Sequence, residues 1–276
     1  MASIASLHVY PVKSCRGIDL ETARVTATGL EWDRRWMIVD ASDRFVTQRT
    51  HPQLATIATA IDEGVLRLSA AGHPRLEVDA EAGGPLRRVQ IWKDSCSGID
   101  AGDAAAAWLA RVLGDALRLM RMDPTVPRLA DPHYAGHRAQ PVSFTDGYPV
   151  LLISRASLAE LNRRLPAPVP MSRFRPNVVI EGVAAHAEDA FADFRVDSVV
   201  LRGIKHCTRC VVSTTDQLDG SRDPDQEPLH TLKTYRHDRV LHGFTFGQNC
   251  VVAGGIGASI SAGDEIALDA GAPAPA

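Results

Sequence analysis

The stretch "FRVDSVVLRGIKHCTRCVVSTT" (residues 194–215) carries both the strand signal and the reactive side chains of this chain. Its β-branched residues favour a pleated sheet on either side of the segment "KHCTRC", and we expect residues 210–215 to form a strand. Similar runs separated by turn residues predict a barrel or sandwich with a few helices. These runs lie at residues 176–182, 249–256 and 264–269.

The N-terminal part is also rich in predicted strands, at residues 6–12, 23–30, 34–40 and 75–80. A helix is predicted over 103–117, capped by Asp103, and a short one after the capping box Ser157-x-x-Glu160. The proline-rich stretch 121–142 is expected to be an irregular connection that forms a lid or rim. The predicted class is therefore mainly β or α+β. Its parts are a β-rich domain (1–120), a β-barrel domain (121–269) and a disordered tail (270–276).

The composition is that of an ordinary globular protein. Of the 276 residues, 45% are hydrophobic and 23% are charged, and the net charge is −3. This net charge does not indicate the basic surface that nucleic-acid binding needs. No apolar run approaches the roughly 20 residues of a membrane span. With no signal peptide and five sparse cysteines, a cytoplasmic protein with free thiols is expected.

The pair Cys207-x-x-Cys210 allows several interpretations. A zinc site needs four ligands, and a second closely spaced pair is missing. A thioredoxin-like dithiol belongs at a helix N-terminus, whereas β-branched residues follow here. Buried packing is the simplest alternative, but Lys205, His206 and Arg209 surround the pair with positive charge. Such charge favours a thiolate and an anionic ligand.

Several other stretches place cations beside hydroxyl or amide groups, as an anionic ligand requires. A strand enters a turn at Lys13 and Ser14, and a predicted strand carries Arg34 and Arg35, one of which is expected to face inward. Weaker versions of the pattern are Thr47 with Arg49, and Arg173 and Arg175 with Asn177. Together with the thiol, these stretches suggest a site for a large anion held partly by a sulfur-to-metal bond.

Seven motifs in order resemble the MOSC proteins, named for the C-terminal domain of molybdenum cofactor sulfurase. The resemblance is to the two-domain reductases, which include the mitochondrial amidoxime-reducing component and bacterial YcbX-type relatives. It covers roughly residues 3–268. The motifs are "YPVKSCRG" (10–17), "GLEWDRRWMIVD" (29–40), "FTDGYPVLLIS" (144–154), "FRPNVVI" (174–180), "KHCTRCVVSTTD" (205–216), "EPLHTLKTYR" (227–236) and "FGQNCVVAGGI" followed by "GDEI" (246–256 and 263–266).

The resemblance implies a MOSC N-terminal β-rich domain, a MOSC β-barrel and a molybdenum cofactor (a molybdenum-bound pyranopterin) between them. It makes Cys210 the molybdenum ligand and Cys207 a non-ligand. Asp146 lies on the substrate side and is expected to be the catalytic proton donor. Residues expected to bind the cofactor, from the resemblance and from the charge pattern, are Lys13, Ser14, Arg34, Arg49, Thr145, Arg175, Asn177 and Arg209.

The implied activity is reduction of N-hydroxylated compounds: amidoximes, hydroxamic acids and N-hydroxylated bases. An iron–sulfur cluster needs four cysteine ligands, and only Cys250 follows Cys210, so no built-in cluster is expected. Electrons would then come from a separate donor such as a ferredoxin, a flavin reductase or a cytochrome-type protein. The alternative is a carrier of molybdenum cofactor or sulfur that shows no reductase turnover.

Overall fold

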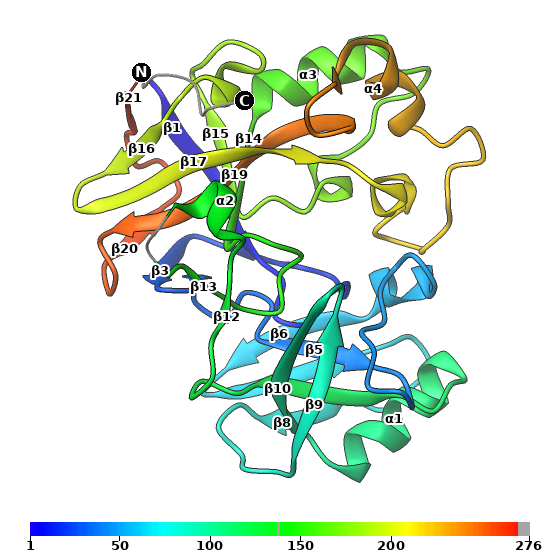
Figure 1. Ribbon diagram of the computed structural model, residues 1–276. Helices are drawn as coiled ribbons and strands as arrows, with labels where there is room; N and C mark the ends of the chain where they lie inside the picture. The colour runs from blue at the N-terminus through cyan, green and yellow to red at the C-terminus, as the bar shows by residue number, and fades with distance from the viewer. Residues whose placement is uncertain (137–138, 270–276) are drawn as a thin grey trace.

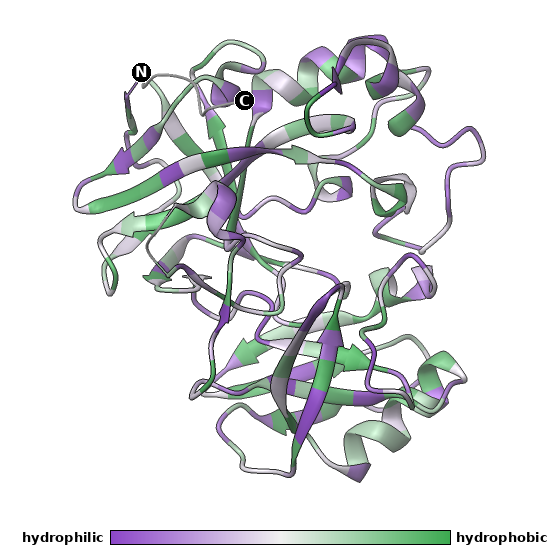
Figure 2. Ribbon diagram, viewed as in Figure 1, coloured by the Kyte–Doolittle hydropathy of each residue, from purple (hydrophilic) through white to green (hydrophobic). Residues whose placement is uncertain are grey.

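The computed structural model describes residues 1–136 and 139–269, and the predicted tail 270–276 lies outside this range. The part described is mainly β, with four α-helices, and it divides into two lobes (Figure 1). The predicted fold class is confirmed. Figure 2 shows the hydrophobic residues concentrated along the strands of both lobes.

The larger lobe is built on a nine-stranded sheet in the order β2-β1-β15-β14-β19-β17-β16-β21, with β18 paired to β19. Its buried face holds a cluster of aliphatic side chains that includes Leu7, Leu152 and Ile180. The strands are β1 (Ser3–Val9), β2 (Ile18–Leu20), β14 (Val150–Ser154), β15 (Val178–Glu181), β16 (Asp193–Val196), β17 (Val199–Thr208), β18 (His237–Asp238), β19 (Gly243–Gly254) and β21 (Ala267–Asp269).

The smaller lobe contains a four-stranded and a three-stranded sheet packed around Trp36 and Trp108. The first sheet comprises β5 (Trp36–Val39), β11 (Arg118–Met122), β10 (Asp94–Asp100) and β9 (Leu86–Ile91), and the second β6 (Ala58–Asp62), β7 (Val65–Ser69) and β8 (Leu76–Asp79). A separate three-stranded sheet joins β20 (Ser259–Ser261), β3 (Thr22–Thr26) and β4 (Gly29–Leu30), and it belongs to the larger lobe, because its buried residues pack in the same cluster as Leu7. The predicted strand 23–30 is therefore a hairpin.

The helices partly match the predictions. Helix α1 (Asp103–Leu113) buries Trp108 and Leu109 as expected, although its N-cap is Gly102. The capping box at Ser157 was wrong, because α3 (Arg155–Arg164) begins one turn earlier, with the Ser154 side chain accepting from the Ser157 amide. Helices α3 and α4 (Leu229–Tyr235) lie together at the top of the larger lobe (Figure 1).

Two predicted strand segments have other conformations. Strand β17 ends at Thr208, and residues Val211–Thr214 form a 3₁₀ helix, η4, in which the Ser213 amide donates to the Cys210 oxygen at 3.0 Å. Arg34 and Arg35 precede β5 in a turn where Trp32 and Arg34 have positive φ angles of 70° and 47°. Sequence alternation therefore does not determine which of the two arginines points inward.

The connection 121–142 is largely irregular in its described residues, 121–136 and 139–142, which also contain the short elements β12 (Arg128–Leu129), α2 (Pro132–Ala135) and β13 (Pro141–Val142). Strands β12 and β13 pair with each other. Buried Arg128 donates to the backbone oxygens of Thr145 (2.8 Å) and Asp146 (3.1 Å), so this connection supports the loop after β13. No helix in residues 1–136 or 139–269 has the length and apolar character needed to cross a membrane.

Candidate cofactor site

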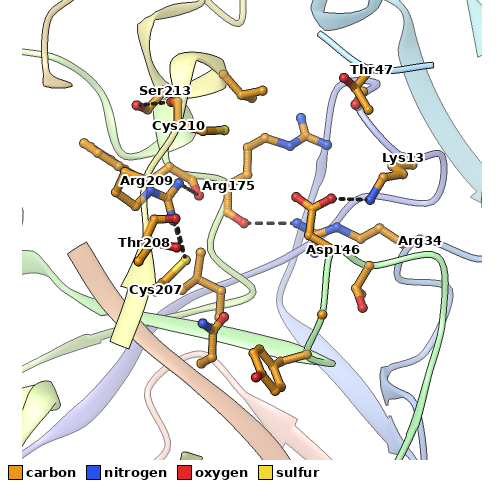
Figure 3. Close-up of a pocket in the computed structure, with 18 of the residues that line it drawn as sticks. Lys13, Arg34, Thr47, Asp146, Arg175, Cys207, Thr208, Arg209, Cys210 and Ser213 are labelled. Atoms are coloured by element: carbon orange, nitrogen blue, oxygen red, sulfur yellow. Dashed lines mark hydrogen bonds and ion pairs between the residues drawn. The ribbon is translucent and has the colours of Figure 1, made fainter. Parts of the chain in front are cut away.

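Residues from both halves of the chain line a hollow of about 340 Å³, here called the central hollow. Its walls come from the turn after β1, the turn before β5, the loop after β13, the segment before β15 and the end of β17 (Figure 3). Four lining residues that are not glycine have positive φ: Ser14, Arg34, Trp92 and Arg175. Strained backbone of this kind gathers at functional sites, where the surrounding structure holds it in place.

Positive charge dominates the lining of the central hollow. Its ionised side chains are one carboxylate, Asp146, and five cations: Lys13, Arg34, Arg49, Arg175 and Arg209. Arg34 has a second carboxylate behind it, because its Nη1 donates to Asp33 Oδ1 at 2.8 Å. The remaining excess of cations suits an anionic ligand with several charges.

Arg175 is buried without a full set of partners. Its guanidinium and that of Arg34 lie on the ring of Tyr10, each 4.2 Å from the ring centroid. Its Nη1 donates to Gln217 Oε1 at 3.2 Å, but its Nη2 has no hydrogen-bond partner among the described residues. Burial, together with repulsion from Arg34, lowers the pKa of Arg175 to about 10. A buried guanidinium with an unpaired N–H group is stabilised when an anion binds beside it.

Lys13 and Asp146 form an ion pair of 2.7 Å on one side of the hollow (Figure 3). Burial lowers the pKa of Lys13, and Asp146 opposes this effect. For Asp146, desolvation raises the pKa, but Lys13 and Arg49 outweigh it and hold the pKa well below its usual range. Asp146 is therefore ionised at neutral pH, which does not favour its predicted role as a proton donor.

The two cysteines of the C-x-x-C motif have separate environments. Arg49 Nη2 donates to Cys210 Sγ at 3.1 Å, whereas Arg209 Nη1 donates to Cys207 Sγ at 3.0 Å. Both thiols are half-buried, so they are not packing residues of a sealed core. In the described part of the chain, no group of three His, Cys, Asp or Glu side chains is placed to hold a metal ion. The contact with Arg49 places positive charge directly at Cys210.

The structure brings together the ten side chains that were assigned a catalytic, cofactor-binding or metal-binding role, whereas Arg35 and Arg173 of the same charge pattern lie outside the hollow. All ten line the central hollow: Lys13, Ser14, Arg34, Arg49, Thr145, Asp146, Arg175, Asn177, Arg209 and Cys210. Asn177 is connected to the first half of the chain, because Arg34 Nη1 donates to its Oδ1 at 3.1 Å. Which of these residues touch a ligand stays a prediction.

Sequence reasoning gave no role to Tyr10 or Trp92. Tyr10 lies within a quoted motif, but only the structure shows its ring between two guanidinium groups. Trp92 follows β9, and its Nε1 donates to Asp146 Oδ1 at 3.2 Å while the Arg49 guanidinium lies 4.5 Å from its ring. No pattern around Trp92 distinguishes it from an ordinary surface aromatic residue.

Comparison with known protein families shows to which family the chain belongs. Residues 1–116 match the MOSC N-terminal beta barrel domain, and residues 139–267 match the MOSC domain. The chain belongs to the MOSC family. This MOSC protein is 35% identical over 256 residues to mitochondrial amidoxime-reducing component 1 of Mus musculus, covering 88% of this chain and 75% of that protein. The Homo sapiens protein of the same name is 34% identical over 268 residues (91% and 79%).

A second group of relatives is represented by mitochondrial amidoxime reducing component 2 of Bos taurus. It is 32% identical over 245 residues, which cover 86% of this chain and 73% of that protein. The resemblance predicted from the seven motifs is thus confirmed. The two family matches fall on either side of α2, and the predicted domain limits of 1–120 and 121–269 stay a prediction because β1 belongs to the larger sheet.

Proposed function

We propose that this MOSC protein is a molybdenum-cofactor-dependent reductase of N-hydroxylated compounds, such as amidoximes, hydroxamic acids and N-hydroxylated bases. The observation that carries the proposal is the half-buried Cys210 thiol in a hollow with an excess of cations. The relatives are named amidoxime-reducing components, which supports the choice of reaction.

The residues of the central hollow fit this cofactor. Cysteine sulfur is a soft ligand of the kind that molybdenum–dithiolene centres take, and Cys210 offers its sulfur beside Arg49. Arg175 Nη2 and Thr145 Oγ1 are buried polar atoms without partners in the described part of the chain, so each has hydrogen-bonding capacity for a bound group. The cofactor would supply the two-electron chemistry that removes oxygen from nitrogen.

The protein's own contribution is binding and charge. Arg34 and Arg175, with Lys13 and Ser14, would hold the anionic organic part, and both guanidinium groups lie on the ring of Tyr10. Arg49 would neutralise the Cys210 thiolate. Converting an N–OH group to N–H consumes two electrons and two protons and releases water. The electrons are assigned to a separate donor of the ferredoxin, flavin reductase or cytochrome type.

The decisive experiment is to produce the protein in a host that synthesises the cofactor and to measure bound molybdenum by elemental analysis. Reduction of benzamidoxime is then followed with a reduced viologen dye. We expect Cys210→Ser to abolish turnover, Cys207→Ser to have a milder effect, and Arg175→Ala to lower molybdenum content while the fold is kept.

Zinc or no metal in the wild-type protein, or equal damage from both cysteine substitutions, would contradict the proposal. Full molybdenum content without any turnover, even with the dye as donor, would instead favour the cofactor carrier. Lys233→Gln, on the exposed side of α4, serves as a control for expression and folding.

A further inference from the structure

A second hollow of about 490 Å³, here called the outer hollow, adjoins the central one. The two share lining residues, among them Trp92, Tyr148 and Cys207, so they lie side by side. Leu129 and Pro132 of the connection form part of the outer wall. A molecule that reaches the Cys207–Cys210 end of the central hollow from this side passes through the outer hollow.

The walls of the outer hollow suit a flat organic group. Trp92 is 44% exposed, and the hydrogen bond from its Nε1 to Asp146 and the contact with Arg49 fix the orientation of its ring. Leu129 is 51% exposed, and half-buried Tyr148 adds a second aromatic surface. Exposed aromatic and aliphatic surface inside a concave site is characteristic of small-molecule binding.

The charged side chains of the outer hollow indicate the sign of the charge that its ligand carries. Two of its carboxylates are paired: Asp94 with Arg128 at 2.8 Å, and Asp146 with Lys13 at 2.7 Å. The third, Asp131, accepts from the His133 amide at the start of α2. By contrast, two lysines of the outer hollow, exposed Lys93 and half-buried Lys205, make no ion pair within residues 1–136 and 139–269. Lys205 is the one held over aromatic rings, because its ammonium lies 3.9 Å from the Tyr134 ring centroid and 5.9 Å from that of Tyr148.

We propose that the outer hollow is the substrate site and that Lys205 makes it prefer planar N-hydroxylated compounds that carry an acidic group, such as a carboxylate, away from the reacting nitrogen. The inference rests on the proposed reductase function. Trp92 and Tyr148 would hold the flat body of the substrate, and Lys205 would pair with the acidic group. The two tyrosine rings position the ammonium by cation–π contact without neutralising it.

The test compares two probes that differ only in charge, 4-carboxybenzamidoxime and 4-carbamoylbenzamidoxime, on the cofactor-loaded protein. Calorimetry gives the Kd of each probe, and the viologen assay gives kcat/KM. We expect the wild-type protein to bind the carboxylate probe more tightly. Lys205→Gln should weaken binding of that probe by about tenfold, because a hydrogen bond to a charged group is lost, and should leave the amide probe within about twofold.

Lys205→Arg should keep the preference, and Lys233→Gln, the same charge change on exposed α4, should leave both Kd values as in the wild type. Equal loss for both probes, no loss for either, or no binding of either probe would overturn the inference. Turnover gives an independent result. If Lys205 controls binding of the carboxylate probe but neither probe is reduced, the proposed reductase function fails while the binding site stands.

Discussion

At the scale of single residues, Tyr10 is fixed on three sides. The guanidinium groups of Arg34 and Arg175 lie on its ring, and its hydroxyl donates to the Pro176 oxygen at 3.0 Å. Burial raises the pKa of Tyr10 to about 12, so the ring stays neutral between the two cations. Any change that displaces this ring disturbs both arginines of the candidate site.

A substitution at Gly17 would displace the Tyr10 ring. A Cβ atom added at Gly17 would lie 2.6 Å from Cε1 of the Tyr10 ring, closer than atoms in proteins approach each other. We expect Gly17→Ala to lower the free energy of unfolding by about 1–3 kcal/mol, as overpacking does, and to lower molybdenum content. Urea denaturation measures the first effect. Gly83→Ala, with no atom within 4 Å of the added Cβ, is the control, and equal stability of the two variants would contradict the argument.

Asp146 leads to a prediction about pH. Burial lowers the pKa of Lys13 and Asp146 raises it, so Asp146→Asn should lower that pKa further. Below the lowered pKa the variant keeps a buried ammonium without its carboxylate, and above it Lys13 is neutral and the penalty disappears. The variant should therefore be less stable than the wild type by about 1 kcal/mol at neutral pH, since the Asp146 side chain is 61% exposed.

The stability difference between Asp146→Asn and the wild type should shrink as the pH rises from about 7 to 10, toward the ordinary pKa of lysine. Thermal unfolding at several pH values measures it. If the stability difference between the variant and the wild type instead grew over this range, the predicted direction of the pH dependence would be wrong.

At the scale of elements, the start of α3 belongs to a buried polar network. The Ser154 amide and the Ser157 hydroxyl both donate to Glu188 Oε1, at 3.0 and 2.6 Å, and the Ser157 hydroxyl accepts from the His186 amide. Glu188 is completely buried. The network explains why the helix begins at a serine that the capping-box pattern did not select.

We expect Ser154→Ala to destabilise the protein by about 1–2 kcal/mol, because the first turn of α3 loses its capping oxygen. Ser198→Ala, in the exposed turn between β16 and β17, should change the stability by less than about 0.5 kcal/mol. Chemical denaturation of both variants tests this. An equal loss of stability in the two variants would contradict the assignment of Ser154 as the N-cap of α3.

The same scale shows what the sequence could and could not predict. Strand signals located β5, β8, β15 and β17, because β-branched runs between turn residues are local features. The 3₁₀ helix after Cys210 was missed, since valine and threonine favour strands and only the packing of the loop overrides that preference. The site residues were found through spaced motifs, whereas the position of Trp92 depends on a hairpin end with a φ of 52°, which no local pattern encodes.

At the scale of the whole molecule, contacts in the site join the two halves of the chain. Lys13 Nζ donates to the Phe144 oxygen at 2.9 Å, and Arg34 Nη2 donates to the Arg175 oxygen at 3.2 Å. In addition, β1 pairs with β15, with Leu7 opposite Val178. These links do not require the connection 121–142 to be intact.

We therefore expect the halves to stay together after the connection is cut. A protease site inserted after Val126, which is 56% exposed, would allow cleavage of the folded protein. The two fragments should elute as one species on size exclusion in native buffer and separate in urea. Separate elution in native buffer would show that the connection, and not the sheet and the site, holds the halves together; the uncut insertion variant is the control.

The pairing of β1 with β15 also has a consequence for synthesis on the ribosome. Ile4 and Leu7 are made near the beginning, but their partners Ile180 and Val178 follow more than 170 residues later. One edge of β1 can pair early with β2, where Leu20 lies opposite Leu7, but at about 5–20 residues per second the edge that pairs with β15 stays open for roughly ten to thirty seconds. During that interval β1 is a segment for chaperones to shield, and the cation-lined cavity cannot assemble until translation has passed it.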